Sequence, residues 1–258
     1  MDHGLRTPAE RSRVETQIAI DINGLDFTYP DGKRALHELH LQVARGETVG
    51  LVGPNGAGKT TLFLCMAGVL SAQSGVLQLA GLDPRHPDER KLLPSRVGFI
   101  FQNSDDQLFS TTVGDDVAFG PLNLGLAADV VRRRVTEALA RVGLAGFAER
   151  VPFHLSAGEK RRAAIAGVLA MKPEILLLDE PSMFLDPRGR RELIALLNEL
   201  AITKIIASHD LEMILDTCQR VVVLDQGKFI GEGPTEQVLS NGALMATHGL
   251  EVPHRLRR

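Results

Sequence analysis

Apolar residues along the chain gather in short runs that glycine, proline and charged residues interrupt. Runs of this length, bounded by turn residues, are typical of strands buried in a sheet. Helical periodicity separates the later runs, at Arg188–Leu200 and Leu211–Thr217. Strands that alternate with helices predict an α/β fold around a mainly parallel sheet. The predicted strands are Ile18–Ile22, Phe27–Tyr29, an alternating stretch through Leu39, Leu41 and Val43, Thr48–Val52, Val97–Phe101, Ile175–Leu178, Lys204–Ala207 and Val221–Leu224.

The pattern changes in residues 103–171, where helical periodicity dominates and no strong strand is visible. We expect this segment, with helices at Ala127–Val142 and Ala157–Met171, to form a helical subdomain inserted into the α/β core. The core itself then comprises residues 18–102 and 172–240. A polar leader, residues 1–17, is expected to be disordered. Residues 241–258 are expected to form a C-terminal tail with a solvated basic end.

The composition narrows the class of protein. The chain has 258 residues, 44% of them hydrophobic, which is enough for a substantial core and excludes a disordered or collagen-like chain. Its net charge of −3, with 4% aromatic residues and no Trp, argues against a nucleic-acid partner. Cys65 and Cys218 lack metal-type spacing and are expected to be buried thiols of a reducing compartment. No run approaches the roughly 20 apolar residues of a membrane helix, and no secretory signal is visible.

The strongest chemical signal is a phosphate-binding loop. Gly53-x-x-x-x-Gly58-Lys59-Thr60 follows a predicted strand and opens a predicted helix, which is the context that this motif requires. Backbone N–H groups and a helix N-terminus bind phosphate oxygens there. Lys59 is expected to reach the β- and γ-phosphates of a nucleotide, and Thr60 to ligate Mg²⁺. The predicted nucleotide-binding residues of this segment are Gly53, Pro54, Asn55, Gly56, Ala57, Gly58, Lys59, Thr60 and Thr61.

Two acidic residues follow the apolar run Ile175–Leu178. Taken alone, adjacent acids after a strand indicate a solvated turn. In a protein with a phosphate loop, the first acid, Asp179, is expected to hold Mg²⁺. The second, Glu180, is then the candidate general base that polarises an attacking water.

The segment Leu155-Ser-Ala-Gly-Glu-Lys-Arg-Arg162 resembles the signature of ATP-binding cassette (ABC) ATPases, and the resemblance extends from Ile18 to Leu239. It implies a P-loop NTPase with a RecA-like, mainly parallel sheet and an antiparallel β subdomain. It further implies that Tyr29 stacks on adenine and that Gln102 faces Mg²⁺ and the transport subunit. Asp186 corresponds to the D-loop aspartate, and His209 to the histidine that contacts the γ-phosphate. Taken singly, Tyr29, Gln102 and His209 also fit core, surface-loop and strand-end residues.

The same resemblance implies that two subunits close head to tail, so that Ser156 and Gly158 of one touch the ATP bound by the other. Lys160, Arg161 and Arg162 are expected on the exposed face of the signature helix. Ala157 stands where the family usually has glycine, and a Cβ is costly wherever φ must be positive. The bulky Met183 and Phe184 replace residues that are usually small. All three departures lie at the expected dimer seam.

Residues 101–109 and 116–126, together with 27–32, look like the ATPase of energy-coupling factor transporters, which import vitamins and transition-metal ions. Residues 159–167 are similar to the cobalt/nickel branch. The resemblance implies a homodimer at the cytoplasmic face of a membrane, with a transmembrane coupling subunit and a substrate-binding membrane subunit. A vitamin importer and a non-transport ATPase clamp are the alternatives. Candidates for docking the coupling subunit, or else for core packing, are Leu108, Phe109, Val113, Val117 and Phe119.

Overall fold

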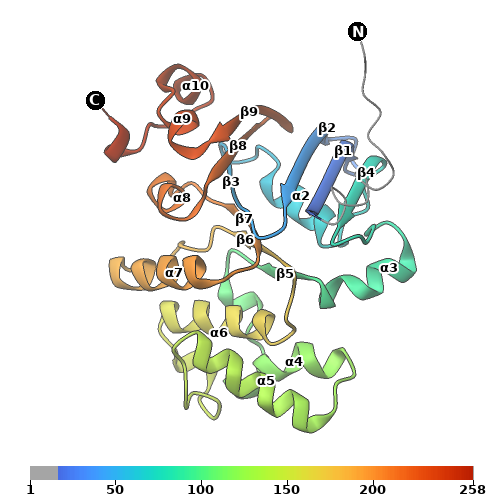
Figure 1. Cartoon of the computed structure of the whole chain (residues 1–258), viewed down its shortest axis with the longest axis vertical. Coiled ribbons are helices and arrows are strands. Elements are labelled where there is room, and N and C mark those ends of the chain that lie inside the picture. Colours follow the sequence, from blue (N-terminus) through green and yellow to red (C-terminus); the bar gives the residue numbers. More distant parts are fainter. Residues whose placement is uncertain (1–16, 258) are drawn as a thin grey trace.

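A computed structural model describes residues 17–257, which fold around two β-sheets (Figure 1). A three-stranded antiparallel sheet has the order β2-β1-β4, and a six-stranded sheet has the order β5-β6-β7-β3-β8-β9. All neighbours in the larger sheet are parallel except β8 and β9. The prediction of an α/β fold with a mainly parallel sheet is confirmed. The strands are β1 (Ile18–Thr28), β2 (Arg34–Ala44), β3 (Thr48–Val52), β4 (Ser74–Leu79), β5 (Val97–Ile100), β6 (Ile175–Asp179), β7 (Thr203–Ala207), β8 (Arg220–Asp225) and β9 (Lys228–Pro234).

Helices cover the large sheet and extend beyond it. α4, α5 and α6 pack on one another and form the expected helical subdomain at the end of the molecule remote from the antiparallel sheet (Figure 1). None of the helices within residues 17–257 has the length and hydropathy needed to cross a membrane. The α-helices are α2 (Lys59–Met66), α3 (Pro87–Leu92), α4 (Val113–Asn123), α5 (Ala128–Arg141), α6 (Ala157–Leu169), α7 (Pro187–Glu199), α8 (Leu211–Thr217), α9 (Thr235–Leu239) and α10 (Gly242–Thr247), and 3₁₀ turns occupy Leu93–Ser95, Ser104–Asp106, Pro152–His154 and His254–Leu256.

The central strands separate two hydrophobic clusters. Along β6, Leu176 and Leu178 face the cluster that includes the helical subdomain, whereas Ile175 and Leu177 face the cluster that includes the antiparallel sheet. Every residue of β3, β6 and β7 is buried, as expected for parallel strands covered on both faces. The burial of both cysteines is also confirmed, and burial raises the pKa of each thiol to about 12.

Several boundaries differ from the sequence prediction. Ile18–Ile22 and Phe27–Tyr29 belong to one strand, β1, whose pairing with β2 shifts register around Gly24. This irregularity broke the alternation on which the prediction relied. The prediction missed β9, because its residues are mostly half-buried or exposed, and α3, because it buries no residue.

The expected tail, residues 241–258, packs against the core over much of its length, whereas His254, Arg255 and Arg257 of its basic end are exposed. Met245 is buried, and Leu250 and Val252 pack against the core. Near the end of the chain, Arg255 pairs with Glu212 (2.7 Å) and with a second carboxylate of α8 (2.8 Å). Of the predicted polar leader, residues 1–16 lie outside the described part of the chain.

Close packing of α6 on β5 depends on Gly98. A Cβ at this position would lie 2.1 Å from Val168 Cγ1, well inside van der Waals contact. Gly98→Ala is therefore expected to lower the free energy of unfolding by about 1–3 kcal/mol, the usual cost of overpacking a core. Gly242→Ala is the matched control, because the nearest atom to its Cβ is 3.9 Å away. Urea unfolding measures both variants, and equal stability of Gly98→Ala and the unsubstituted chain would contradict this packing.

Candidate functional site

The phosphate-loop sequence forms a tight turn between β3 and α2. Gly53 has φ 156° and Gly58 has φ 112°. Neither position has room for a side chain. A Cβ on Gly53 would lie 1.9 Å from Leu224 O, and a Cβ on Gly58 would lie 2.9 Å from Ala35 O. Only glycine satisfies both demands, so the loop can bring its backbone N–H groups around an anion.

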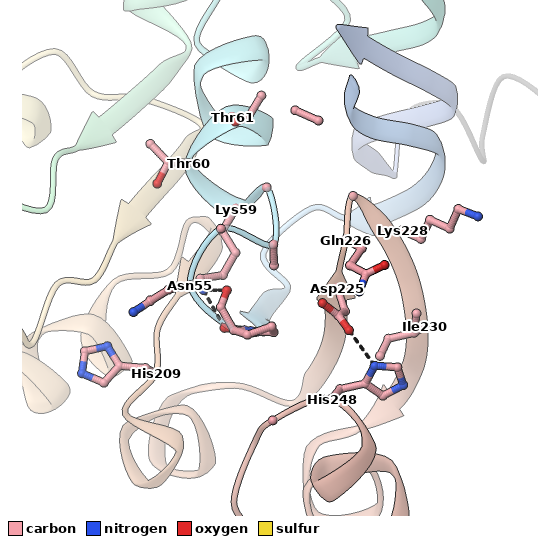
Figure 2. A pocket seen from close by; sticks show the side chains of 18 of the residues that line it. Asn55, Lys59, Thr60, Thr61, His209, Asp225, Gln226, Lys228, Ile230 and His248 are labelled. Atoms are coloured by element: carbon pink, nitrogen blue, oxygen red, sulfur yellow. Dashed lines mark hydrogen bonds and ion pairs between the residues drawn. The ribbon is translucent and has the colours of Figure 1, made fainter. Parts of the chain in front are cut away.

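This loop borders a cleft of about 1530 Å³. The cleft brings together the residues that sequence reasoning assigned to the loop, the strand ends and the adenine contact. Figure 2 shows Lys59 inside the curve of the loop, with His209 on one side of the cleft and His248 on the other. The predicted site residues that line it are Tyr29, Gly53, Pro54, Asn55, Gly56, Ala57, Gly58, Lys59, Thr60, Thr61, Gln102, Asp179, Glu180 and His209.

Lys59 is held by the loop that it follows. Its Nζ donates hydrogen bonds to Gly53 O (2.6 Å) and Pro54 O (3.1 Å). Burial lowers the pKa of Lys59, while the carboxylates of Glu180 and Asp179 act in the opposite direction. The ammonium group therefore lies inside a loop of phosphate-binding geometry, satisfied by backbone carbonyls.

Two oxygen ligands for a divalent cation meet at the start of α2. Thr60 Oγ1 donates a hydrogen bond to Asp179 Oδ2 (2.8 Å) at the end of β6. Burial, reinforced by the neighbouring Glu180 carboxylate, raises the pKa of Asp179 despite this bond. A hydroxyl and a carboxylate are hard ligands of the kind that Mg²⁺ prefers, so the residues fit the expected ion. Gln102 lines the same cleft, where its Nε2 donates to Met183 Sδ (2.8 Å).

Glu180 follows β6 directly and has a left-handed backbone, with φ 47°. Its Oε2 accepts hydrogen bonds from Ser208 Oγ (3.2 Å) and His209 N (3.1 Å), and lies 2.7 Å from His209 Nδ1. These contacts orient the carboxylate from the end of β7. Sequence reasoning missed Ser208, although a small polar residue directly before His209 at a strand end was a usable signal.

Tyr29 lies at the edge of the cleft. Its hydroxyl shares a hydrogen bond with Thr61 Oγ1 (2.9 Å), and its ring meets Phe27 edge-on at 4.9 Å between centroids. The ring therefore packs against the antiparallel sheet while it also lines the cleft. The packing interpretation is confirmed, and stacking on adenine stays a prediction.

The far side of the cleft comes from residues that sequence reasoning did not consider. Asp225 and Gln226 in the β8–β9 turn line it, as do His248 and Leu250 after α10. His248 Nδ1 lies 2.8 Å from Asp225 Oδ2, as Figure 2 shows. No motif marked these residues, and His248 and Leu250 fall in the segment expected to be a tail.

Ser156, Gly158 and Asp186 do not line the cleft. Ser156 caps α6, since its Oγ accepts from Glu159 N. Glu159 Oε2 in turn accepts from Ser156 N and Ser156 Oγ, and these two bonds lower the pKa of Glu159. Asp186 caps α7 by accepting from Gly189 N (2.6 Å). The two helix starts are neighbours, because a Cβ on Gly158 would lie 3.9 Å from Gly189 Cα.

Two residues that depart from the family pattern near these helix starts differ in backbone conformation. Ala157 begins α6 and is not among the residues with positive φ, so the expected cost of its Cβ does not arise in this conformation. Phe184 does have a positive φ, 66°, and its side chain is 70% exposed. A bulky side chain in this backbone region is strained.

The expected exposed face at residues 160–162 is wrong for its central member. Arg161 is only 2% exposed, and it donates hydrogen bonds to the carbonyls of Phe101 and Gln102. Lys160 and Arg162 are themselves largely covered, paired with Asp105 and Glu192. The helix is buried on this side because residues 101–107 pack over it.

The docking candidates divide into two groups. Val113 and Val117 are fully buried core residues, and Leu108 is partly buried against the same core. Phe109 and Phe119 are 64% and 49% exposed, and their rings form an edge-to-face pair with centroids 4.9 Å apart. Only the two phenylalanines form an exposed apolar pair.

Comparison with known proteins accounts for this arrangement. The family model described as ABC transporter matches residues 36–183, more than half of the chain. The chain belongs to the ABC transporter family. It is an ATPase of that family, and its nucleotide is ATP. An energy-coupling factor transporter ATP-binding protein, EcfA, from Methanothermobacter thermautotrophicus is 47% identical to this ABC ATPase over 91% of the chain and 76% of the relative.

Other relatives agree. A putative ABC transporter ATP-binding protein of Gloeobacter violaceus is 50% identical over 92% of the chain and 98% of that protein. The solved structure of cbiO1 from Clostridium perfringens, part of the ABC transporter complex cbiONQ, superposes with a TM-score of 0.80 at 36% identity, covering 93% of this chain and 98% of that one. A dimeric ATP-binding cassette in a post-hydrolysis state, bound to ADP and Pi, gives 0.75 at 26% identity, with coverages of 84% and 98%. The chain is thus an ATP-binding subunit of an energy-coupling factor type ABC transporter.

Lys59→Ala tests the phosphate end of the cleft. The variant is expected to bind ATP at least about tenfold more weakly, because a hydrogen bond to a charged group is worth about 1.5–3 kcal/mol. Lys91→Ala is the control, since Lys91 lies on α3 and pairs with Asp88. Isothermal titration with ATP measures both variants. An unchanged dissociation constant for Lys59→Ala would contradict the role of this lysine.

Proposed function

We propose that this ABC ATPase hydrolyses ATP in a closed homodimer and thereby powers uptake of a transition-metal ion, cobalt or nickel, through separate membrane subunits. The observation that carries the hydrolytic part is the convergence of Lys59, the Thr60–Asp179 pair and the Glu180–His209 pair on one cleft. Each of the three supplies a different requirement of phosphoryl transfer: charge, cation ligands and a base.

Binding begins with the triphosphate in the loop. Loop N–H groups hold the phosphate oxygens, and Lys59 exchanges its bonds with Gly53 O and Pro54 O for bonds to the β- and γ-phosphates. Tyr29 covers the adenine ring at the cleft edge. Thr60, Asp179 and Gln102 are the residues that would hold Mg²⁺, which when bound neutralises charge on the phosphates.

Glu180 then acts as the general base. Its carboxylate takes a proton from a water while the water oxygen forms a bond to the γ-phosphorus. The bond from that phosphorus to the β–γ bridging oxygen breaks, and ADP leaves with its electron pair. His209 supports this step twice, since its backbone N–H and its ring both contact Glu180 Oε2. The ring also lines the cleft, where in this proposal it contacts the γ-phosphate.

A second copy of the chain completes the site in this proposal. Ser156, Gly158 and Asp186 lie outside the cleft at the adjoining starts of α6 and α7. In a head-to-tail dimer, this face meets the ATP in the partner's cleft, where the start of α6 provides N–H groups for an anion. The dimeric relative bound to ADP and Pi supports such an assembly.

The exposed pair of Phe109 and Phe119 is the proposed contact for a coupling helix of the transmembrane subunit. Exposed aromatic residues that cluster on a surface are common at protein interfaces. Gln107 and Gln102 lie in the adjoining segment that leads to the cleft, so a helix docked there adjoins the nucleotide site. In this proposal, the ATPase lies at the cytoplasmic face of the membrane, beside a coupling subunit and a substrate-binding subunit.

The similarity of residues 159–167 to the cobalt/nickel branch supports a metal ion as cargo. The test is ATP-driven uptake of Co²⁺ and Ni²⁺ into vesicles that contain the chain and its candidate membrane subunits. Uptake is expected with the unsubstituted chain and is expected to be lost with Lys59→Ala. An intact, ATP-hydrolysing complex that moves neither ion would contradict the metal assignment and favour a vitamin. Failure of any membrane complex to form would favour a non-transport clamp.

Glu180→Gln tests the chemistry. The amide cannot accept the water proton, so turnover is expected to fall by about 10²–10⁴-fold. ATP binding persists, because Lys59 and the loop are unchanged, and the ATP-bound dimer is expected to accumulate. Phosphate release and sedimentation measure turnover and dimer formation, with Glu199→Gln, an exposed acid at the end of α7, as the control. Normal hydrolysis by Glu180→Gln would show that another group is the base.

A further inference from the structure

Arg161 joins two parts of the chain that the proposed mechanism treats separately. It lies in the second turn of α6, five residues after Ser156. Its Nη1 donates to Phe101 O (2.6 Å) and its Nη2 to Gln102 O (2.5 Å). The guanidinium fork therefore holds two consecutive carbonyls of the segment that carries Gln102.

The same segment, residues 101–107, has two further anchors. Gln107 extends the edge of β5, because its Oε1 accepts from Phe101 N (3.0 Å) and its Nε2 donates to Phe99 O (2.9 Å). On the other side, Lys160 Nζ donates to Asp105 Oδ1 (2.7 Å). The carboxylate of that pair is exposed, so solvent weakens it. Among these contacts, the buried fork of Arg161 is the strongest connection from α6 to this segment.

Burial of the guanidinium is costly. It lowers the pKa of Arg161 to about 10, with the nearby Asp179 carboxylate acting against this shift. Its Nε atom is buried and has no hydrogen-bond partner among the described residues. Apolar residues of similar volume often stabilise a core as well as a buried charge does. Among the described residues, the hydrogen bonds of this buried arginine end on the loop carbonyls, so they serve the position of that loop rather than overall stability.

We propose that Arg161 is a positioning residue that makes the segment carrying Gln102 move together with the signature helix α6. This inference rests on the proposed dimer, in which the start of α6 meets ATP of the second copy. Engagement of Ser156 and Gly158 then shifts Gln102 in the chain's own cleft, and docking of a membrane partner near Gln102 shifts the signature in return. Such reciprocity is required of any coupling between two sites.

The chemistry suits arginine alone. A guanidinium presents parallel N–H groups that can hold two carbonyls at once, whereas the lysine ammonium is a single flexible point. The bonds end on backbone oxygens, so they fix the path of the loop and not merely one side chain. Arg161→Lys is therefore expected to restore only part of what Arg161→Met loses.

The first measurement compares steady-state kinetics of Arg161→Met and Arg162→Met in the full chain. Arg162 is adjacent on α6 and pairs with Glu192 on α7 rather than with the loop, which makes it a matched control. Arg161→Met is expected to lower kcat about 10- to 100-fold through misplacement of Gln102, with the dissociation constant of ATP within about twofold. Arg162→Met is expected to leave both values near those of the unsubstituted chain. Equal kinetics for the two variants would overturn the inference.

The second measurement does not depend on turnover. Amide hydrogen exchange of residues 101–107 is followed with and without ATP in the Glu180→Gln background, and sedimentation reports dimer formation. ATP is expected to slow exchange in this segment when Arg161 is present. With Arg161→Met, the dimer is expected to form while the segment stays unprotected. Protection that persists in Arg161→Met would overturn the inference.

The inference can still be tested if the dimer does not form or if a variant does not fold. If the Glu180→Gln chain fails to dimerise with ATP, the proposed dimer fails, and exchange of the nucleotide-free proteins still tests the connection. Exchange of residues 101–107 no faster in Arg161→Met than in Arg162→Met then overturns it. If Arg161→Met does not fold, Arg161→Lys takes its place, and full protection and full kcat in that variant would contradict the need for a fork.

Discussion

The parallel register of three central strands is the constraint on which the nucleotide site depends. Leu51 of β3 and Asp179 of β6 both pair with Ala207 of β7, so the three strands end at one level. Backbone hydrogen bonds continue past these ends, from Glu180 N to Ala207 O and from Ser208 N to Leu51 O. The phosphate loop, the acidic pair and the histidine therefore meet although they come from distant parts of the chain. A shift of one strand by one residue would separate them and turn their side chains to the other face.

Burial at the ends of these strands determines the direction of the pKa shifts of the charged site residues. Lys59 has a lowered pKa and Asp179 a raised pKa, in each case chiefly because burial disfavours the charged form. Their mutual attraction offsets part of that cost. Opposite charges that lie this close in a covered site interact more strongly than they would in water. The strained φ of Glu180 belongs to the same pattern, since the sheet edge holds the residue where its carboxylate meets β7.

Whether the role of a residue could be predicted from the sequence depended on which groups that residue contacts. Lys59, Asp179 and Glu180 were predictable because a short motif encodes both the chemistry and its place at a strand end, and the structure brings them into one cleft. Arg161 was misassigned, because its partners are backbone carbonyls about 60 residues away and carry no side-chain signature. The packing of the C-terminal segment was not predicted, for a related reason. Its contacts, such as Met245 in the core, depend on how β8 and β9 are placed.

Two side chains at the start of α2 have partners within the protein. Lys59 binds loop carbonyls and Thr60 binds Asp179. For these two side chains, nucleotide binding therefore exchanges hydrogen bonds instead of creating them, and the net gain per exchanged bond is small. The charge of the triphosphate has no equivalent among the loop carbonyls. It follows that charge, rather than the number of hydrogen bonds, is what makes a nucleotide the better partner for Lys59.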